Sequence, residues 1–237
     1  MPVPPRLRGE TLTLHVCYLH GFGSSPQSSK AQVLAERLAA HGLRLHCPDL
    51  NEPDFSTITV SRMVGQVERN LRELPPGPAV LVGSSLGALV AWHAAARAAA
   101  TARPVDRLVL LAPALDFGTN RLRHFGEPGV EAWRREGWRD FMHYATAQPR
   151  RVWFELYEDA GRFDSDAVEV SQPTLIFQGR HDTVVDPAMV QRFAAGRPNV
   201  TLRMLDDDHQ LHASLDTIWR DTEAFLGLAP PTRAESG

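Results

Sequence analysis

The chain has 237 residues, of which 43% are hydrophobic, 22% charged and 8% aromatic. This length and composition are typical of a globular domain of ordinary size and exclude a disordered or collagen-like chain. The formal net charge of −3 provides no overall attraction for nucleic acid, so we expect no nucleic-acid partner. The sequence does not indicate an oligomeric state.

The two cysteines, Cys17 and Cys47, form no C-x-x-C motif, so neither a disulfide framework nor a cysteine-based zinc site is expected. The first twelve residues contain no apolar segment of the kind that a signal peptide needs. The most apolar stretch, 86–102, is interrupted by His93 and Arg97 and is therefore not a membrane span. We expect a cytoplasmic protein with free thiols and no bound metal.

Short apolar runs alternate with amphipathic segments along the chain. Near-continuous Val, Leu and Ile indicate strands that are covered on both faces. The predicted strands cover residues 12–21, 43–50, 79–85, 107–115, 173–179 and 200–206. Predicted helices carry apolar stripes over 31–38, 60–74 and 211–222, and Asp186-Pro187 predicts the start of another. This order predicts an α/β fold, with a mostly parallel sheet of roughly six strands and helices on both faces.

One interval, residues 116–170, breaks this alternation because it contains many aromatic side chains but no clean buried strand. An insertion of this length usually has a function, such as covering a site, and the alternative is an elaboration that only extends the sheet edge. We therefore expect a core formed by 11–115 and 171–228, a cap or lid insertion at 116–170, and a flexible tail at 229–237.

The strongest local motif is a G-x-S-x-G formed by residues 83–87. It follows an apolar strand and precedes a helical run, which is the strand–turn–helix setting of a nucleophile elbow. In such a tight turn Gly83 and Gly87 avoid steric collisions, and Ser85 presents its hydroxyl at a helix N-terminus that favours a developing anion. We expect Ser85 to be a nucleophile. The alternative is an ordinary glycine-rich turn.

A serine hydroxyl is a weak nucleophile unless a base accepts its proton. His209 directly follows the last predicted strand, where the histidine of such a site belongs. We favour His209 over His212, because His212 falls inside the helical stripe that begins at Leu211.

The histidine in turn needs an acid that fixes its tautomer. Asp182 directly follows the predicted strand 173–179 and is favoured over Asp116, which follows the strand before it. The chain order of serine, aspartate and histidine is then that of α/β-hydrolases. Asp186 is better explained as a helix cap, and the three aspartates at 206–208 as a solvated turn.

A tetrahedral intermediate also needs hydrogen-bond donors for its oxyanion. We expect one donor to be the N–H of Leu86, which follows the nucleophile, and the other to be the N–H of Phe22 in the turn after the first strand. Gly21 and Gly23 are expected to let this turn approach the substrate. His20 is expected to orient the turn by hydrogen bonding.

Together these motifs resemble the YqiA/YcfP-type small serine esterases of the α/β-hydrolase superfamily. The blocks that carry the resemblance are YLHGFGSSPQSSKA (18–31), GSSLG (83–87), QGRHDTVVD (178–186) and the histidine after the last strand. The resemblance extends from residue 18 to about 226 and implies hydrolysis of acyl esters, including thioesters, without a cofactor. It implies Ser85 as nucleophile, Asp182 as acid and His209 as base.

The leading hypothesis is therefore a serine esterase that cleaves small acyl esters through an acyl-enzyme. A second hypothesis is an acyl-CoA thioesterase, in which arginines of the insertion hold an anionic substrate, although a solvated charged face explains them as well. These arginines are Arg121, Arg123, Arg134, Arg135, Arg139, Arg150 and Arg151. A third hypothesis, from another class, is a non-catalytic binding module on a hydrolase scaffold.

Overall fold

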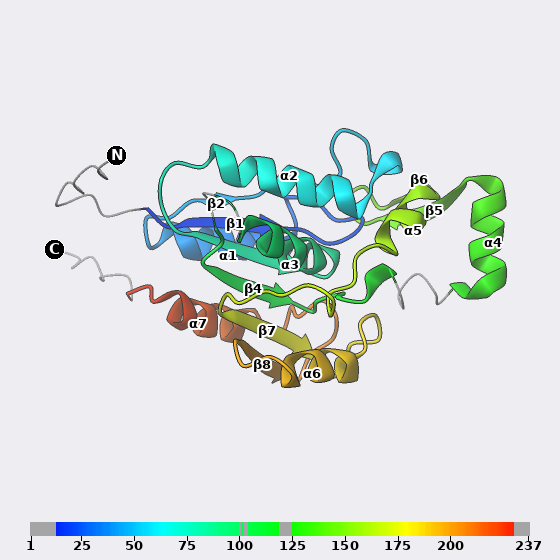
Figure 1. Ribbon diagram of the computed structural model, residues 1–237. Helices are drawn as coiled ribbons and strands as arrows, with labels where there is room; N and C mark the ends of the chain where they lie inside the picture. The colour runs from blue at the N-terminus through cyan, green and yellow to red at the C-terminus, as the bar shows by residue number, and fades with distance from the viewer. Residues whose placement is uncertain (1–12, 100, 102–103, 119–124, 230–237) are drawn as a thin grey trace.

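The computed structural model describes residues 13–99, 101, 104–118 and 125–229 (Figure 1). The predicted tail, apart from residue 229, lies outside the described residues, as do Arg121 and Arg123 of the insertion. No helix in the described part of the chain is long and apolar enough to cross a membrane.

A parallel six-stranded sheet forms the centre of the fold, in the order β2-β1-β3-β4-β7-β8 (Figure 1). The strands are β1 (His15–Leu19), β2 (Leu45–His46), β3 (Ala79–Ser84), β4 (Arg107–Leu111), β7 (Thr174–Gly179) and β8 (Val200–Leu205). Strands β1, β3 and β7 are buried along their whole length, as their continuous apolar sequences predict. The predicted sheet is thereby confirmed.

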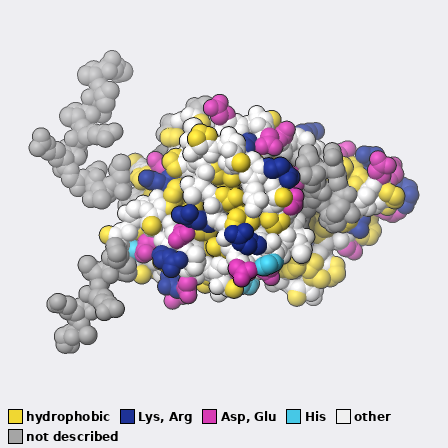
Figure 2. Space-filling model, turned by 90° about the horizontal axis from the view of Figure 1, so that it is seen from below, with side chains coloured by type: hydrophobic (Ala, Val, Ile, Leu, Met, Phe, Trp, Pro, Cys, Tyr) yellow, Lys and Arg dark blue, Asp and Glu magenta, His cyan; other side chains and the backbone are white. Residues whose placement is uncertain are grey.

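Helices cover both faces of this sheet. On one face lie α1 (Ser29–Ala39) and α7 (Leu215–Leu226), and on the other α2 (Val60–Glu73), α3 (Leu86–Ala98) and α6 (Pro187–Ala195). Asp186 caps α6 by accepting a hydrogen bond from the N–H of Ala188 at 2.9 Å, as predicted. The charged surface is mixed in sign: basic and acidic side chains are interspersed on the face shown in Figure 2.

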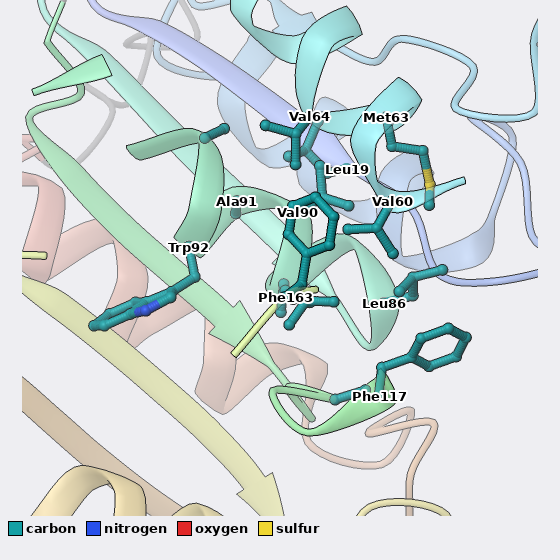
Figure 3. Packing of buried hydrophobic residues seen from close by; sticks show 14 of the residues in the cluster. Leu19, Val60, Met63, Val64, Leu86, Val90, Ala91, Trp92, Phe117 and Phe163 are labelled. Atoms are coloured by element: carbon teal, nitrogen blue, oxygen red, sulfur yellow. The ribbon is translucent and has the colours of Figure 1, made fainter. Parts of the chain in front are cut away.

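Helix α3, which follows the G-x-S-x-G motif, lies in the main apolar core. Its residues from Leu86 to Ala95 are all buried, so it is covered on every side rather than on one stripe. Figure 3 shows Leu86, Val90 and Trp92 of this helix among the side chains of its neighbours. The dense packing fixes the start of α3, and with it the turn that carries Ser85.

The insertion contains four elements at one end of the molecule (Figure 1). These are α4 (Gly126–Glu136), β5 (Trp138–His143), β6 (Gln148–Trp153) and α5 (Glu155–Ala160). Strands β5 and β6 form an antiparallel hairpin that is separate from the central sheet. Most of their side chains are not buried, which explains why no buried strand is recognisable in this part of the sequence.

Several element boundaries differ from the sequence prediction, among them those of β1 and β4, which are shorter than the expected 12–21 and 107–115. Strand β2 has only two residues, Leu45 and His46, where 43–50 was expected. Helix α7 begins at Leu215 and not at Leu211, because Leu211 has a φ of 57°, a left-handed conformation that a right-handed helix excludes. Leu211 is buried all the same, so its apolar character reflects packing outside the helix.

Candidate active site

Ser85 occupies a strained turn between β3 and α3. Its φ of 53° and ψ of −115° are rare for a residue with a side chain. The N–H of Ser85 donates to the carbonyl oxygen of Leu111 at 2.9 Å, and the N–H of Ala114 donates to the carbonyl oxygen of Ser85 at 3.2 Å. The end of β4 therefore holds the serine backbone in this conformation.

The two glycines of the motif are required by close contacts. A Cβ at Gly83 would lie 2.5 Å from the Cα of Ala88, and one at Gly87 would lie 2.1 Å from the carbonyl oxygen of Leu19. Both distances are well below van der Waals contact with backbone atoms that have little freedom to move. The motif is thus explained by the packing of α3 against β1 and β3.

Ser85, His209 and Asp182 meet at the carboxyl edge of the sheet. His209 lies in the loop after β8, and its Nε2 is 3.1 Å from the Oγ of Ser85. The Nδ1 of His209 is 2.8 Å from Oδ2 of Asp182, which follows β7. The structure brings together three residues that are separated by up to 124 positions in the sequence.

Asp182 is buried but fully hydrogen-bonded. Its Oδ1 accepts from the N–H groups of Val184 and Val185, both at 2.8 Å, and its Oδ2 also accepts from Nε2 of Gln178 at 2.9 Å. Burial by itself raises the pKa of Asp182, but the hydrogen bonds from His209 and Val185 outweigh it and leave the pKa below its usual value. The carboxylate is therefore ionised and able to orient the imidazole.

The loop that carries His209 is held from two sides. Oδ1 of Asp208 accepts a hydrogen bond from the N–H of Gln210 at 2.7 Å, and the Nζ of Lys30 donates to the carbonyl oxygen of Gln210 at 2.9 Å. Neither Lys30 nor Gln178 was expected from the sequence to be a partner of these residues.

The backbone N–H groups of the two predicted oxyanion donors, Leu86 and Phe22, are not used in the hydrogen bonds of a helix or strand. Leu86 is the first residue of α3, and the N–H groups of a first helical turn have no intrahelical acceptor. Among the described residues, no backbone acceptor is recorded for the N–H of Phe22. Phe22 lines the groove above Ser85, which is a suitable position for an oxyanion donor. The assignment of both donors stays a prediction.

The turn that carries Phe22 is anchored from beneath by His20. The His20 ring is buried, with its Nδ1 3.0 Å from the carbonyl oxygen of Gly21 and its Nε2 accepting from the N–H of Leu50 at 3.0 Å. Gly21 lies against Ser85, since its Cβ would be 3.3 Å from that of the serine. The reason for a glycine at position 23 differs from the expected one: an added Cβ would lie 2.6 Å from the carbonyl oxygen of Met142 in the hairpin.

A groove of about 810 Å³ opens above Ser85 and His209. One of its walls is formed by residues 144–146, at the turn of the β5–β6 hairpin. The hairpin is attached through aromatic contacts, with the ring centroid of Phe141 5.3 Å from that of Phe22. The insertion therefore contributes directly to the surroundings of the nucleophile.

The structure also shows where the rival residues lie. His212 precedes α7 instead of lying within it, so that expectation was wrong; it is exposed, and its Nε2 is 2.9 Å from the Oγ of Ser29. Asp116 lines a separate cavity with Phe163 and Arg192. None of the arginines in the described residues lines the groove above Ser85.

Comparison with solved structures identifies the fold. A protein from Agrobacterium vitis S4 classed as a hydrolase has a TM-score of 0.80 at 24% identity, with 90% of this chain and 87% of that chain covered. Mouse alpha/beta hydrolase domain-containing protein 10 has a TM-score of 0.76 at 21% identity, with 93% and 92% covered. Est1E from Butyrivibrio proteoclasticus, in a structure with bound ferulic acid, has a TM-score of 0.75 at 19% identity, with 94% and 91% covered. The chain has the α/β-hydrolase fold.

The chain also matches a sequence family, described as "Uncharacterised protein family (UPF0227)", over residues 15–226. It belongs to this family. No curated protein matches the chain in sequence.

Proposed function

We propose that this protein is a serine hydrolase that cleaves carboxylic esters through an acyl-enzyme. The observation that carries the proposal is the hydrogen-bonded series from Ser85 Oγ through His209 to the Asp182 carboxylate, at 3.1 and 2.8 Å. The hydrolase, esterase and lipase names of the structural neighbours support the same class of reaction.

The mechanism follows from the atoms that face one another. Ser85 Oγ attacks the acyl carbon while Nε2 of His209 takes its proton, and the N–H groups of Leu86 and Phe22 stabilise the oxyanion. His209 then protonates the departing alcohol, which leaves the acyl group on Ser85. Water attacks this ester with His209 again as base, and the acid is released. The ionised Asp182 stabilises the imidazolium that forms in each step.

The alternative of an acyl-CoA thioesterase loses its original support, because that hypothesis relied on arginines near the mouth of the site. Arg134, Arg135, Arg139 and Arg151 of the insertion have other partners. Arg134 pairs with Glu131 at 2.7 Å, and the guanidinium of Arg151 lies 3.7 Å from the ring centre of Trp138. A thioester can still be attacked by the same nucleophile, so it stays a secondary substrate class.

The direct test is pre-steady-state hydrolysis of p-nitrophenyl butyrate. We expect a burst of p-nitrophenol with an amplitude near one per protein chain, because acylation releases the phenol before water cleaves the acyl-enzyme. Ser85→Ala should abolish the burst and the turnover. Turnover of that variant at the wild-type rate would contradict the proposal, and absence of any turnover in the wild type would favour the non-catalytic binding module.

A further inference from the structure

The groove above Ser85 has a mixed lining, in which apolar side chains such as Phe22 and Val184 lie beside hydroxyl groups. The hydroxyls include those of Ser24, Ser25, Ser29 and Thr146. Among the described residues that line the groove, there is no aspartate or glutamate. Such a groove can hold the apolar part of a substrate while its hydroxyl groups bind a polar substituent.

The groove also contains the single lysine of the chain. Lys30 is only 8% exposed, lies on the first turn of α1, and donates one hydrogen bond through Nζ to Gln210. An ammonium group has three donors, so Nζ has the capacity for two hydrogen bonds besides the one to Gln210. Beside it, the Oγ of Ser29 and the Nε2 of His212 form a hydrogen-bonded pair at the groove wall.

Lys30 keeps a positive charge at neutral pH in spite of its burial. Burial lowers the pKa of Lys30 to about 8, while the carboxylates of Asp208, Asp207 and Asp182 act in the opposite direction. None of those three carboxylates lines the groove. A partly desolvated ammonium with free donors interacts strongly with an anion, because water screens the pair only weakly.

We propose that the groove selects small esters that carry a carboxylate group, and that Lys30 binds this carboxylate. The inference rests on the proposed ester hydrolysis and assigns its substrate class. Lys30 is then a specificity-determining residue in addition to supporting the loop of His209.

Two matched substrate pairs test the proposal, one for each side of the ester bond. Monoethyl succinate against ethyl succinamate places the carboxylate on the acyl side, and O-acetylglycolate against O-acetylglycolamide places it on the alcohol side. In each pair an amide of the same shape replaces the carboxylate. We expect kcat/KM to favour the carboxylate at least tenfold in one pair, the scale of one charge-assisted hydrogen bond. A ratio near or below one in both pairs would overturn the proposal.

Variants on helix α1 separate the local effect of Lys30 from the overall charge. Lys30→Met should bring the ratio of carboxylate to amide close to one, even if both rates fall because the loop of His209 is loosened. Arg37→Met removes the same charge from an exposed position on α1 and should leave the ratio unchanged. A preference that survives in Lys30→Met, or disappears in Arg37→Met, would contradict the assignment.

Wild-type measurements keep the test valid if Lys30→Met does not fold. The preference should decrease as pH rises through about 8, where Lys30 loses its charge. A ratio that is constant up to pH 10 would contradict the proposal. If Ser85 cleaves both members of each pair at the ester bond at equal rates, only this inference fails, and the proposed ester hydrolysis stands.

Discussion

Replacement of Asp182 by Asn should remove most activity while leaving a folded protein. The carboxylate accepts hydrogen bonds on both oxygens, two from backbone N–H groups on Oδ1 and those from Gln178 and His209 on Oδ2. An asparagine has only one acceptor oxygen, so one side must present an NH₂ group to these donors. The backbone pair holds the oxygen, and the NH₂ group then faces His209.

His209 would respond by changing its tautomer. With an NH₂ group opposite it, Nδ1 becomes an acceptor and the proton moves to Nε2, which is the atom 3.1 Å from Ser85 Oγ. A protonated Nε2 cannot accept the serine proton. We expect kcat to fall about 10⁴-fold, which corresponds to roughly 5 kcal/mol of transition-state stabilisation. The loss of the Gln178 hydrogen bond, and of the carboxylate charge that strengthens the bond to His209, should lower the free energy of unfolding by about 1–3 kcal/mol.

The assay is steady-state hydrolysis of p-nitrophenyl butyrate, together with urea unfolding to show that the variant is folded. Asp116→Asn is the matched control, because Asp116 follows the neighbouring strand but lines a separate cavity; it should retain wild-type activity. The reasoning would be refuted if Asp182→Asn kept activity within threefold of the wild type, or if Asp116→Asn lost as much.

Two further predictions concern stability. The pKa of Asp182 is lower in the folded protein than in the unfolded chain, so its ionised form stabilises the fold above an unfolded pKa of about 3.9 and this contribution is lost as pH falls through the folded pKa. The difference in unfolding free energy between wild type and Asp182→Asn should therefore shrink between pH 5 and the acid range, and a constant difference would contradict this account. Gly87→Ala should destabilise the protein by at least about 3 kcal/mol, since its Cβ would lie 2.1 Å from the Leu19 carbonyl oxygen. Gly196→Ala, with no atom within 4 Å of the added Cβ, should stay within about 0.5 kcal/mol in the same urea titration, and equal losses in both variants would refute the packing argument.

The central sheet was predictable because its four inner strands, β1, β3, β4 and β7, are buried almost throughout. The continuous apolar runs of β3 and β7 indicate strands directly, and their parallel pairing with β4 places their carboxyl ends at one edge. That edge is where the G-x-S-x-G motif, Asp182 and His209 are found. The local chemistry and the topology thus pointed to the same residues, and the structure brings them within hydrogen-bonding distance.

The insertion was not predictable in the same way. Strands β5 and β6 pair with each other, and most of their side chains face solvent, so no apolar pattern marks them. Their position over the groove depends on aromatic contacts such as Phe141 with Phe22, which join residues 119 positions apart. Lys30 also lacked a local signal for its role, because its partner Gln210 is 180 positions away.

The most direct test of the account is the site of covalent labelling by a fluorophosphonate. Such a reagent reacts with a serine hydroxyl that a neighbouring base has activated. Peptide mass spectrometry should find a single label, on Ser85 and not on the adjacent Ser84, and His209→Gln should slow labelling by several orders of magnitude. Labelling of another serine, or equal labelling in Ser85→Ala, would contradict the proposal that the Ser85 hydroxyl is the nucleophile.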